Sequence, residues 1–68
     1  MAPTLASTGV VVEALPSASF GVKLDGGGRV VAYLAGKLKA ARTKVRVGDR
    51  VLVEVAARAG RIVFKYKL

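Results

Sequence analysis

The sequence predicts a small all-β fold, a five-stranded barrel with one short helix between the third and fourth strands. Five short segments are either rich in β-branched residues or hydrophobic at every second position, as is typical of strands with one buried face. One further segment has the hydrophobic spacing of a helix. The chain has 68 residues, which leaves room for one hydrophobic core and therefore for one domain.

The beginning of the chain has the weakest pattern. Residues 1–8 show no clear alternation and include a proline, so we expect a flexible N-terminal lead-in followed by a single domain over residues 9–68. The segment Val10–Ala14 is short and β-branched and predicts the first strand. The Leu-Pro-Ser sequence at 15–17 predicts a turn after it.

The next two strands are expected to form a hairpin. Side chains alternate along Ala18–Leu24, which predicts a half-buried second strand. The sequence Asp25-Gly26-Gly27-Gly28 predicts the hairpin turn, because glycine adopts positive φ without steric cost. The segment Arg29–Leu34 predicts the third strand. From the second strand, the side chains expected in the core are Phe20, Val22 and Leu24.

A helical pattern follows the third strand. Leu34, Leu38 and Ala41 recur at spacings of four and three residues, which predicts about two turns of helix. The period then changes to two, so we expect an extended approach to the next turn with Val45 and Val47 on one side and Lys44 and Arg46 on the other.

The last two strands are predicted at Arg50–Val55 and Arg61–Lys67, joined by a short link at 56–60. Both segments alternate between hydrophobic and polar positions, and the second places a line of basic side chains on the outer face. The residues expected to face the core are Val51, Val53, Val55, Ile62, Phe64 and Tyr66.

Three strands, a helix and two further strands are the element order of an OB-fold barrel. The main alternative among small barrels is the SH3-like fold, which needs no helix between its third and fourth strands. The helical spacing of Leu34, Leu38 and Ala41 therefore favours the OB-fold. Closure of the sheet also removes exposed strand edges.

The charges of the chain are strongly unbalanced. Twelve Lys and Arg stand against four Asp and Glu, for a formal net charge of +8. Five of these cations lie within the eleven residues Gly36–Arg46. Clustered cations on a small basic domain are typical of proteins that bind nucleic-acid phosphates, because each neutralised phosphate releases condensed counterions. We therefore expect a nucleic-acid partner, and the alternative is a charged surface that only raises solubility.

The missing residue types argue against several other functions. The chain has no His and no Cys, so it lacks a ready acid-base group, a thiol nucleophile and the usual transition-metal ligands, and we expect neither an enzyme nor a cofactor or metal. The glycines at 26–28 lie between two strands and lack the Gly-Lys-Ser/Thr ending of a phosphate-binding loop. Neither a membrane span nor a signal peptide is indicated, so we expect a cytoplasmic protein with no membrane partner.

Several segments occur in the order and spacing of a known family, and their combination is specific although each alone is weak. They are Gly9–Pro16, Phe20–Leu24, Gly36-Lys37, Gly48–Val51 and Gly60–Phe64. With one short deletion, the sequence from Gly9 to Lys65 resembles bacterial translation initiation factor 1, a family of S1-like OB-fold proteins. The resemblance implies binding to the decoding site of the small ribosomal subunit, in the position of an aminoacyl-tRNA. It also implies cooperation with other initiation factors and no catalysis.

The resemblance implies RNA contacts from the helical loop and from the last strand. Arg42 and Arg46 belong to the same cationic cluster as the lysines that match the family there. Tyr33 and, after it, Tyr66 are candidates for stacking on a base, whereas Phe20 and Phe64 share faces with aliphatic residues and are expected in the core. The candidate RNA-binding residues are Lys37, Lys39, Arg42, Lys44, Arg46, Arg61, Lys65 and Tyr33.

The restricted amino-acid alphabet leaves a second function open. His, Cys, Trp, Asn and Gln are all absent, which fits either a GC-rich genome or a simplified or designed sequence. The alternative is accordingly a simplified or designed OB-barrel scaffold that binds nucleic acids without specificity. A cold-shock-like RNA chaperone is a third hypothesis, and the presence of only four aromatic residues argues against it. In each case we expect a monomer.

Overall fold

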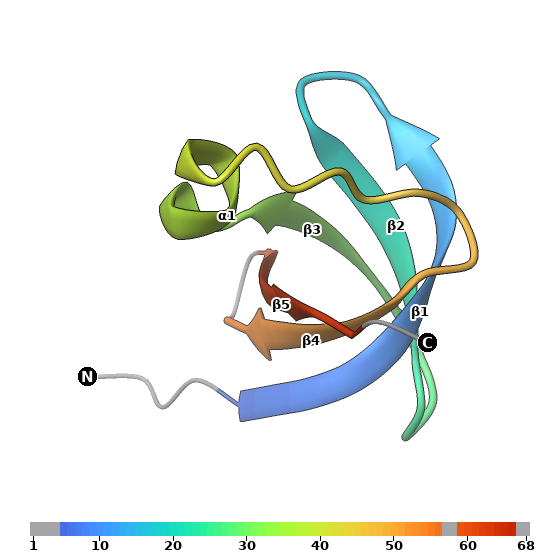
Figure 1. The fold of residues 1–68 in the computed structure, drawn as a ribbon. Helices are drawn as coiled ribbons and strands as arrows, with labels where there is room; N and C mark the ends of the chain where they lie inside the picture. Colours follow the sequence, from blue (N-terminus) through green and yellow to red (C-terminus); the bar gives the residue numbers. More distant parts are fainter. Residues whose placement is uncertain (1–4, 57–58, 67–68) are drawn as a thin grey trace.

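The computed structural model describes residues 5–56 and 59–66, which form a closed five-stranded barrel (Figure 1). Around the barrel the strands follow the order β1-β2-β3-β5-β4, and all neighbours are antiparallel except β3 with β5. The predicted five-stranded barrel with a short helix between β3 and β4 is confirmed. The elements are β1 (Leu5–Leu15), β2 (Ser19–Leu24), β3 (Arg29–Leu34), α1 (Gly36–Ala40), β4 (Arg50–Val55) and β5 (Gly60–Lys65).

Strand β1 is the longest strand and curves around the barrel so that it pairs with β2 and with β4 (Figure 1). It begins at Leu5, so the prediction that the fold starts at Gly9 was wrong for residues 5–8; residues 1–4 lie outside the described part. Backbone hydrogen bonds to β4 form this part of β1, and they need no alternation of side chains. At Gly9, where β1 contacts both neighbours, a Cβ atom would lie 2.6 Å from the carbonyl oxygen of Lys23. Glycine therefore permits the close approach of the two strands.

The core lies inside the barrel and receives a side chain from every strand. Val22, Val51, Val53 and Ile62, all predicted to be in the core, are fully buried. Phe20 is only partly buried but packs against this cluster. The fully buried residues are Val11, Val22, Ala32, Val51, Val53 and Ile62, and partly buried Leu24, Val30, Leu34, Leu38, Val45 and Val55 pack against them.

A β-bulge in β5 changes which side chains of this strand face the core. Leu52 pairs with Phe64 whereas the next residue of β4 pairs with Ile62, so Val63 is an extra residue in β5. Because one extra residue reverses the alternation beyond it, Phe64 points outward and is 49% exposed. The predictions that Phe64 and Tyr66 face the core were therefore wrong. The predicted end of this strand at Lys67 lies outside the described residues.

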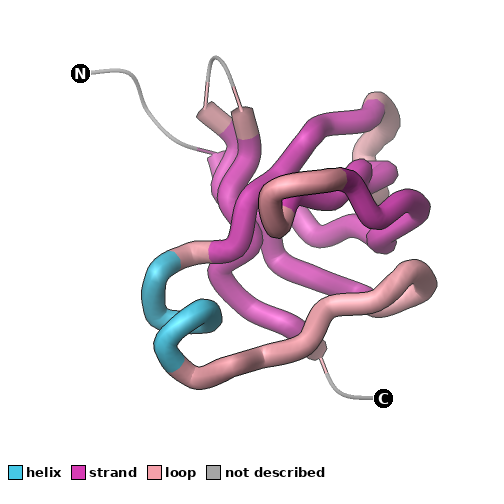
Figure 2. The backbone as a smooth tube through the Cα atoms, turned by 90° about the horizontal axis from the view of Figure 1, so that it is seen from above, coloured by secondary structure: helices cyan, strands magenta, loops and turns pink. Residues whose placement is uncertain are grey.

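The segment between β3 and β4 contains the helix and a long loop, seen from above in Figure 2. Helix α1 has five residues, and Ala41, expected on its buried face, is exposed beyond its end. Val45 packs against the core, but Val47, expected on the same side of the chain, is 59% exposed. Backbone hydrogen bonds attach the chain to β1 immediately afterwards, at Gly48 and Asp49. Among the described residues, no helix is long and apolar enough to cross a membrane.

Candidate nucleic-acid interface

Residues 36–49, which we call the basic segment, comprise α1 and the loop that leads to β4. Five cationic side chains project from this segment, and all five residues are exposed to solvent. The structure thus brings together on one segment most of the predicted RNA-binding residues. They are Lys37, Lys39, Arg42, Lys44 and Arg46.

The four acidic side chains of the protein are all paired with cations outside the basic segment. Residues 5–56 and 59–66 contain ten Lys and Arg, and ten less the four paired ones leaves six without a carboxylate partner, of which five lie in the basic segment. Unbalanced positive charge is therefore concentrated there, where it would attract a polyanion. The pairs are Glu13 with Arg29, Asp25 with Arg50, Asp49 with Lys65 and Glu54 with Arg61.

Helix α1 ends in a compact backbone motif that orients the first half of the basic segment. The Thr43 N–H donates to the Leu38 carbonyl oxygen and the Arg42 N–H to that of Lys39, both at 3.0 Å. This is the hydrogen-bond pattern of a Schellman motif, whose residue after the C-cap adopts the left-handed conformation. That residue is Arg42, with φ of 55° where glycine is usual. Leu38 packs against the core below it, so the cations before and after Arg42 project from a fixed support.

The second half of the basic segment is fixed to β1. The Gly48 N–H donates to the Val11 carbonyl oxygen at 2.7 Å, and the Val11 N–H donates to that of Asp49 at 2.9 Å. The Arg46 N–H donates to Asp49 Oδ2 at 2.8 Å. This hydrogen bond, followed by the nearby Lys65 ammonium, lowers the pKa of Asp49 below its ordinary value of 3.8. Asp49 therefore stays ionised at neutral pH and closes the turn.

Lys65 connects β5 with the basic segment. Its Nζ donates to the Lys44 carbonyl oxygen at 2.6 Å and lies 3.4 Å from Asp49 Oδ2. The side chain is only 28% exposed, because the bulge at Val63 turns it toward this loop. Lys65 was predicted as an RNA contact, but its ammonium group is engaged in holding the loop backbone.

Arg61 and Tyr33 lie side by side on the outer face of the barrel, because they are register partners on the parallel strands β5 and β3. Tyr33 is 48% exposed, as a base-stacking residue must be. Arg61 donates to Glu54 Oε1 at 3.2 Å. An exposed ion pair of this kind is weak and readily exchanged for another anion.

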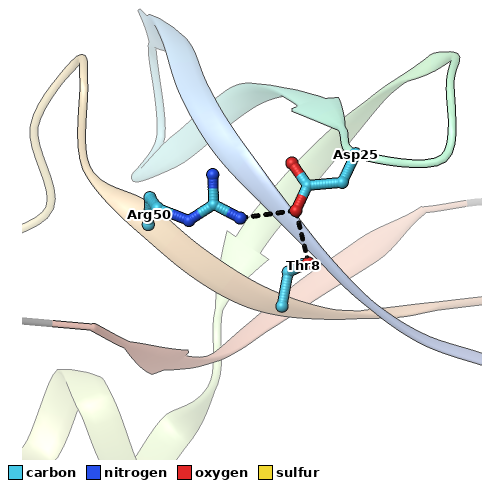
Figure 3. Close-up of polar contacts among 3 residues, drawn as sticks. All are labelled: Thr8, Asp25 and Arg50. Carbon is cyan, nitrogen blue, oxygen red and sulfur yellow. Dashed lines mark hydrogen bonds and ion pairs between the residues drawn. The ribbon is translucent and has the colours of Figure 1, made fainter.

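The remaining carboxylate with a shifted pKa is structural. Asp25 follows β2, and its Oδ2 accepts hydrogen bonds from Thr8 Oγ1 on β1 at 2.6 Å and from the Arg50 guanidinium on β4 (Figure 3). The hydrogen bond from Thr8 and then that from Arg50 lower the pKa of Asp25. This contact joins three strands where the barrel closes. Within residues 5–56 and 59–66, no three carboxylates lie close enough to hold a metal ion.

Sequence reasoning missed the exposure of Phe64, whereas it named Tyr66 as a second candidate for stacking. Phe64 and Tyr66 lie on the surface with ring centroids 4.9 Å apart and ring planes at 74°. Strict alternation along the last strand assigned both to the core, and the sequence contains no signal for the bulge at Val63. Only the register between β4 and β5 places them outside.

Comparison with known proteins agrees with the geometry of the barrel. The family model for translation initiation factor 1A / IF-1 matches residues 2–68. Translation initiation factor IF-1 of Nitrobacter hamburgensis is 45% identical over 62 residues, which cover 87% of this chain and 67% of that protein. The IF-1 of Rhodopseudomonas palustris strain ATCC BAA-98 / CGA009 is 47% identical with the same coverage.

Two solved structures are similar in fold. The solution structure of translation initiation factor 1 from the Wolbachia endosymbiont of Brugia malayi has a TM-score of 0.78 and 35% sequence identity, and the match covers 94% of this chain and 79% of that one. Part of YjeQ from Thermotoga maritima has a TM-score of 0.77 and 29% identity, over 93% of this chain and 23% of that one. With the family model matching nearly the whole sequence, the chain belongs to the translation initiation factor 1A / IF-1 family.

Proposed function

We propose that this protein binds ribosomal RNA at the decoding site of the small ribosomal subunit, through the basic segment, and acts in the cytoplasm as a binding protein without catalysis. The single observation that carries the proposal is the segregation of charge: every carboxylate pairs with a cation elsewhere, which leaves the five cations of residues 36–49 for phosphates. Membership of the family supports the ribosome as the partner.

The roles within the site follow from the contacts. The five cations of the basic segment bind phosphates, because they are exposed and have no carboxylate partner within the described part of the chain. Arg61 and Tyr33 provide a second, weaker contact on the outer face. Lys65 holds the loop in position through Lys44 and Asp49. Base readout by hydrogen bonds is minor, since the chain has no Asn or Gln.

Binding to purified small subunits, followed by chemical footprinting, tests this proposal. We expect protection of decoding-site nucleotides. The logarithm of the binding constant should fall with the logarithm of the salt concentration with a slope of about −3.5, the value for roughly five neutralised phosphates. Replacing all five cations of the basic segment by Gln should lower affinity by about three orders of magnitude at 0.1 M salt. Protection elsewhere on the subunit, or a slope near zero, would contradict the proposal.

A second candidate function is sequence-independent nucleic-acid binding, which the net charge of +8 favours. The same footprinting experiment separates it from the first. Equal affinity for the small subunit, for an unrelated single-stranded RNA and for DNA would support it. Preference for the small subunit at equal salt concentration would exclude it.

A further inference from the structure

Phe64 and Tyr66 form an exposed aromatic pair on the outer surface of the barrel. The two rings pack edge to face, with centroids 4.9 Å apart. Phe64 is 49% exposed and Tyr66 is 36% exposed. Edge-to-face packing lets the edge of one ring cover one face of the other, so flat aromatic surface remains open to solvent. The bulge at Val63 creates this arrangement.

The surroundings of the pair fix its orientation. Phe64 lies opposite the partly buried Leu52 on β4. The Tyr66 N–H donates to the Arg50 carbonyl oxygen at 2.9 Å, so the chain continues alongside β4 beyond the end of β5. The two rings are therefore held by a neighbouring strand and by each other. A held pair loses less conformational entropy when it binds a flat ligand.

The aromatic pair and the basic segment are connected through Lys65. Phe64 and Tyr66 flank Lys65 in the sequence, and Lys65 donates to the backbone of Lys44. The same end of β5 thus presents two rings on the outer face and supports the cationic loop from the other face. Proteins that bind single-stranded nucleic acid combine these two elements, cations for the backbone and aromatic rings for the bases.

We propose that Phe64 and Tyr66 are a stacking platform for one unpaired base of the RNA whose phosphates bind the basic segment. The inference rests on the proposed function, because it assumes an RNA ligand. Charge complementarity favours this ligand over a protein partner, since the described residues carry ten cations against four carboxylates and the strand that bears the pair contacts the basic segment through Lys65. The platform is tolerant of base identity, because every base has a π-face.

The test uses the full chain and two short single-stranded RNAs of equal length. One RNA carries 2-aminopurine at a single position among normal bases, and the other is abasic throughout. Phe64→Leu and Tyr66→Leu keep apolar volume but remove the ring. We expect each variant to bind the base-bearing RNA roughly 5- to 150-fold more weakly. Binding to the abasic RNA and the salt slope should not change, because the number of phosphate contacts is unaltered.

A matched control removes exposed apolar surface that is not aromatic. Val31 is 45% exposed on β3, and Val31→Ala should leave both affinities unchanged. Quenching of 2-aminopurine fluorescence by the wild-type protein, lost in Phe64→Leu, would support direct stacking. All variants should retain the thermal stability of the parent to within a few degrees, since neither ring is in the core.

Three outcomes would overturn the inference. Equal weakening toward the base-bearing and abasic RNAs would mean that the rings act only through the fold. Unchanged RNA binding together with altered self-association would assign the surface to a second copy of the chain. Unchanged binding in every respect would also exclude the platform. Failure of the proposed function looks different, because the wild-type protein would then bind neither RNA with a measurable salt slope.

Discussion

The basic segment and strand β5 both carry cations that the sequence predicts as RNA contacts, but the two regions use them differently. The five cations of the segment are exposed and lack carboxylate partners among the described residues, whereas Arg61 and Lys65 on β5 are each paired with a carboxylate. The segment therefore offers charge to an external ligand, and β5 uses its charge mainly within the protein. Similar cations thus have different roles in the two regions, because only those of β5 are paired with a carboxylate.

The largest effect should come from removing charge in the segment. Lys37→Gln with Lys39→Gln should weaken RNA binding by about 25-fold at 0.1 M salt and reduce the slope by about 1.4, because two phosphate contacts are lost. The control is the double variant Lys23→Gln with Arg29→Gln, which has the same net charge. Fluorescence anisotropy at several salt concentrations measures the RNA affinity of both double variants. Equal weakening by both double variants would mean that only net charge matters.

Substitution of Lys65 tests whether its ammonium group binds an RNA phosphate or only holds the loop in position. Lys65→Met removes a hydrogen bond from a charged donor, so the free energy of unfolding should fall by about 1 to 2 kcal/mol. RNA affinity should fall because the loop is less ordered, while the salt slope stays that of the wild type. Urea denaturation and anisotropy measure the two quantities. A slope reduced by about 0.7 would instead identify Lys65 as a phosphate contact.

Arg61 should show a smaller effect. Its ion pair with Glu54 is exposed, so Arg61→Gln should change the free energy of unfolding by less than about 1 kcal/mol. If the guanidinium exchanges Glu54 for a phosphate, affinity should fall by at most about fivefold at 0.1 M salt. Glu54→Gln is the matched control and should slightly strengthen binding. A loss larger than that of the Lys37 and Lys39 double variant would reverse the ranking of the two regions.

The smallest effect concerns pH. The folded state lowers the pKa of Asp49 below its ordinary value of 3.8, so Asp49 stabilises the fold at pH values above 3.8, and this contribution is lost as the pH falls through the lowered pKa of the folded state. Asp49→Asn should therefore flatten the decline in stability below about pH 4. Chemical denaturation at a series of acidic pH values measures the free energy of unfolding of both proteins. An unchanged decline in the variant would show that the turn at Asp49 does not depend on its charge.

The sequence predicts the barrel well because its strands alternate over a single core. The third strand and the fourth strand occur where the alternation placed them, and the glycine-rich turn joins β2 and β3. The start of β1 could not be predicted, since Leu5 to Thr8 are ordered by pairing with β4 and not by their own pattern. Tertiary hydrogen bonding of the backbone leaves no periodic signal in the side chains.

The sequence predicted which residues make up the candidate site, but not which of its cations are exposed and which are paired within the protein. The cluster at 36–49 is visible as a run of cations. The pairing of Lys65 with Asp49, which lie sixteen positions apart, depends on how β5 passes the loop. The exposure of Phe64 depends on one unpaired residue in the β4–β5 ladder. Both facts are set by register, which a single sequence does not encode locally.

The bulge at Val63 means that strand register, more than residue identity, decides what β5 presents to its surroundings. If the ladder ran on without the bulge, Val63 would lie opposite Leu52 and Phe64 opposite Val51, so the phenyl ring would face inward and the lysine next to it outward. The outer wall would then exchange an aromatic character for a cationic one although both side chains were retained. Gain or loss of a bulge in this strand is therefore a direct route by which related barrels could acquire different ligand preferences.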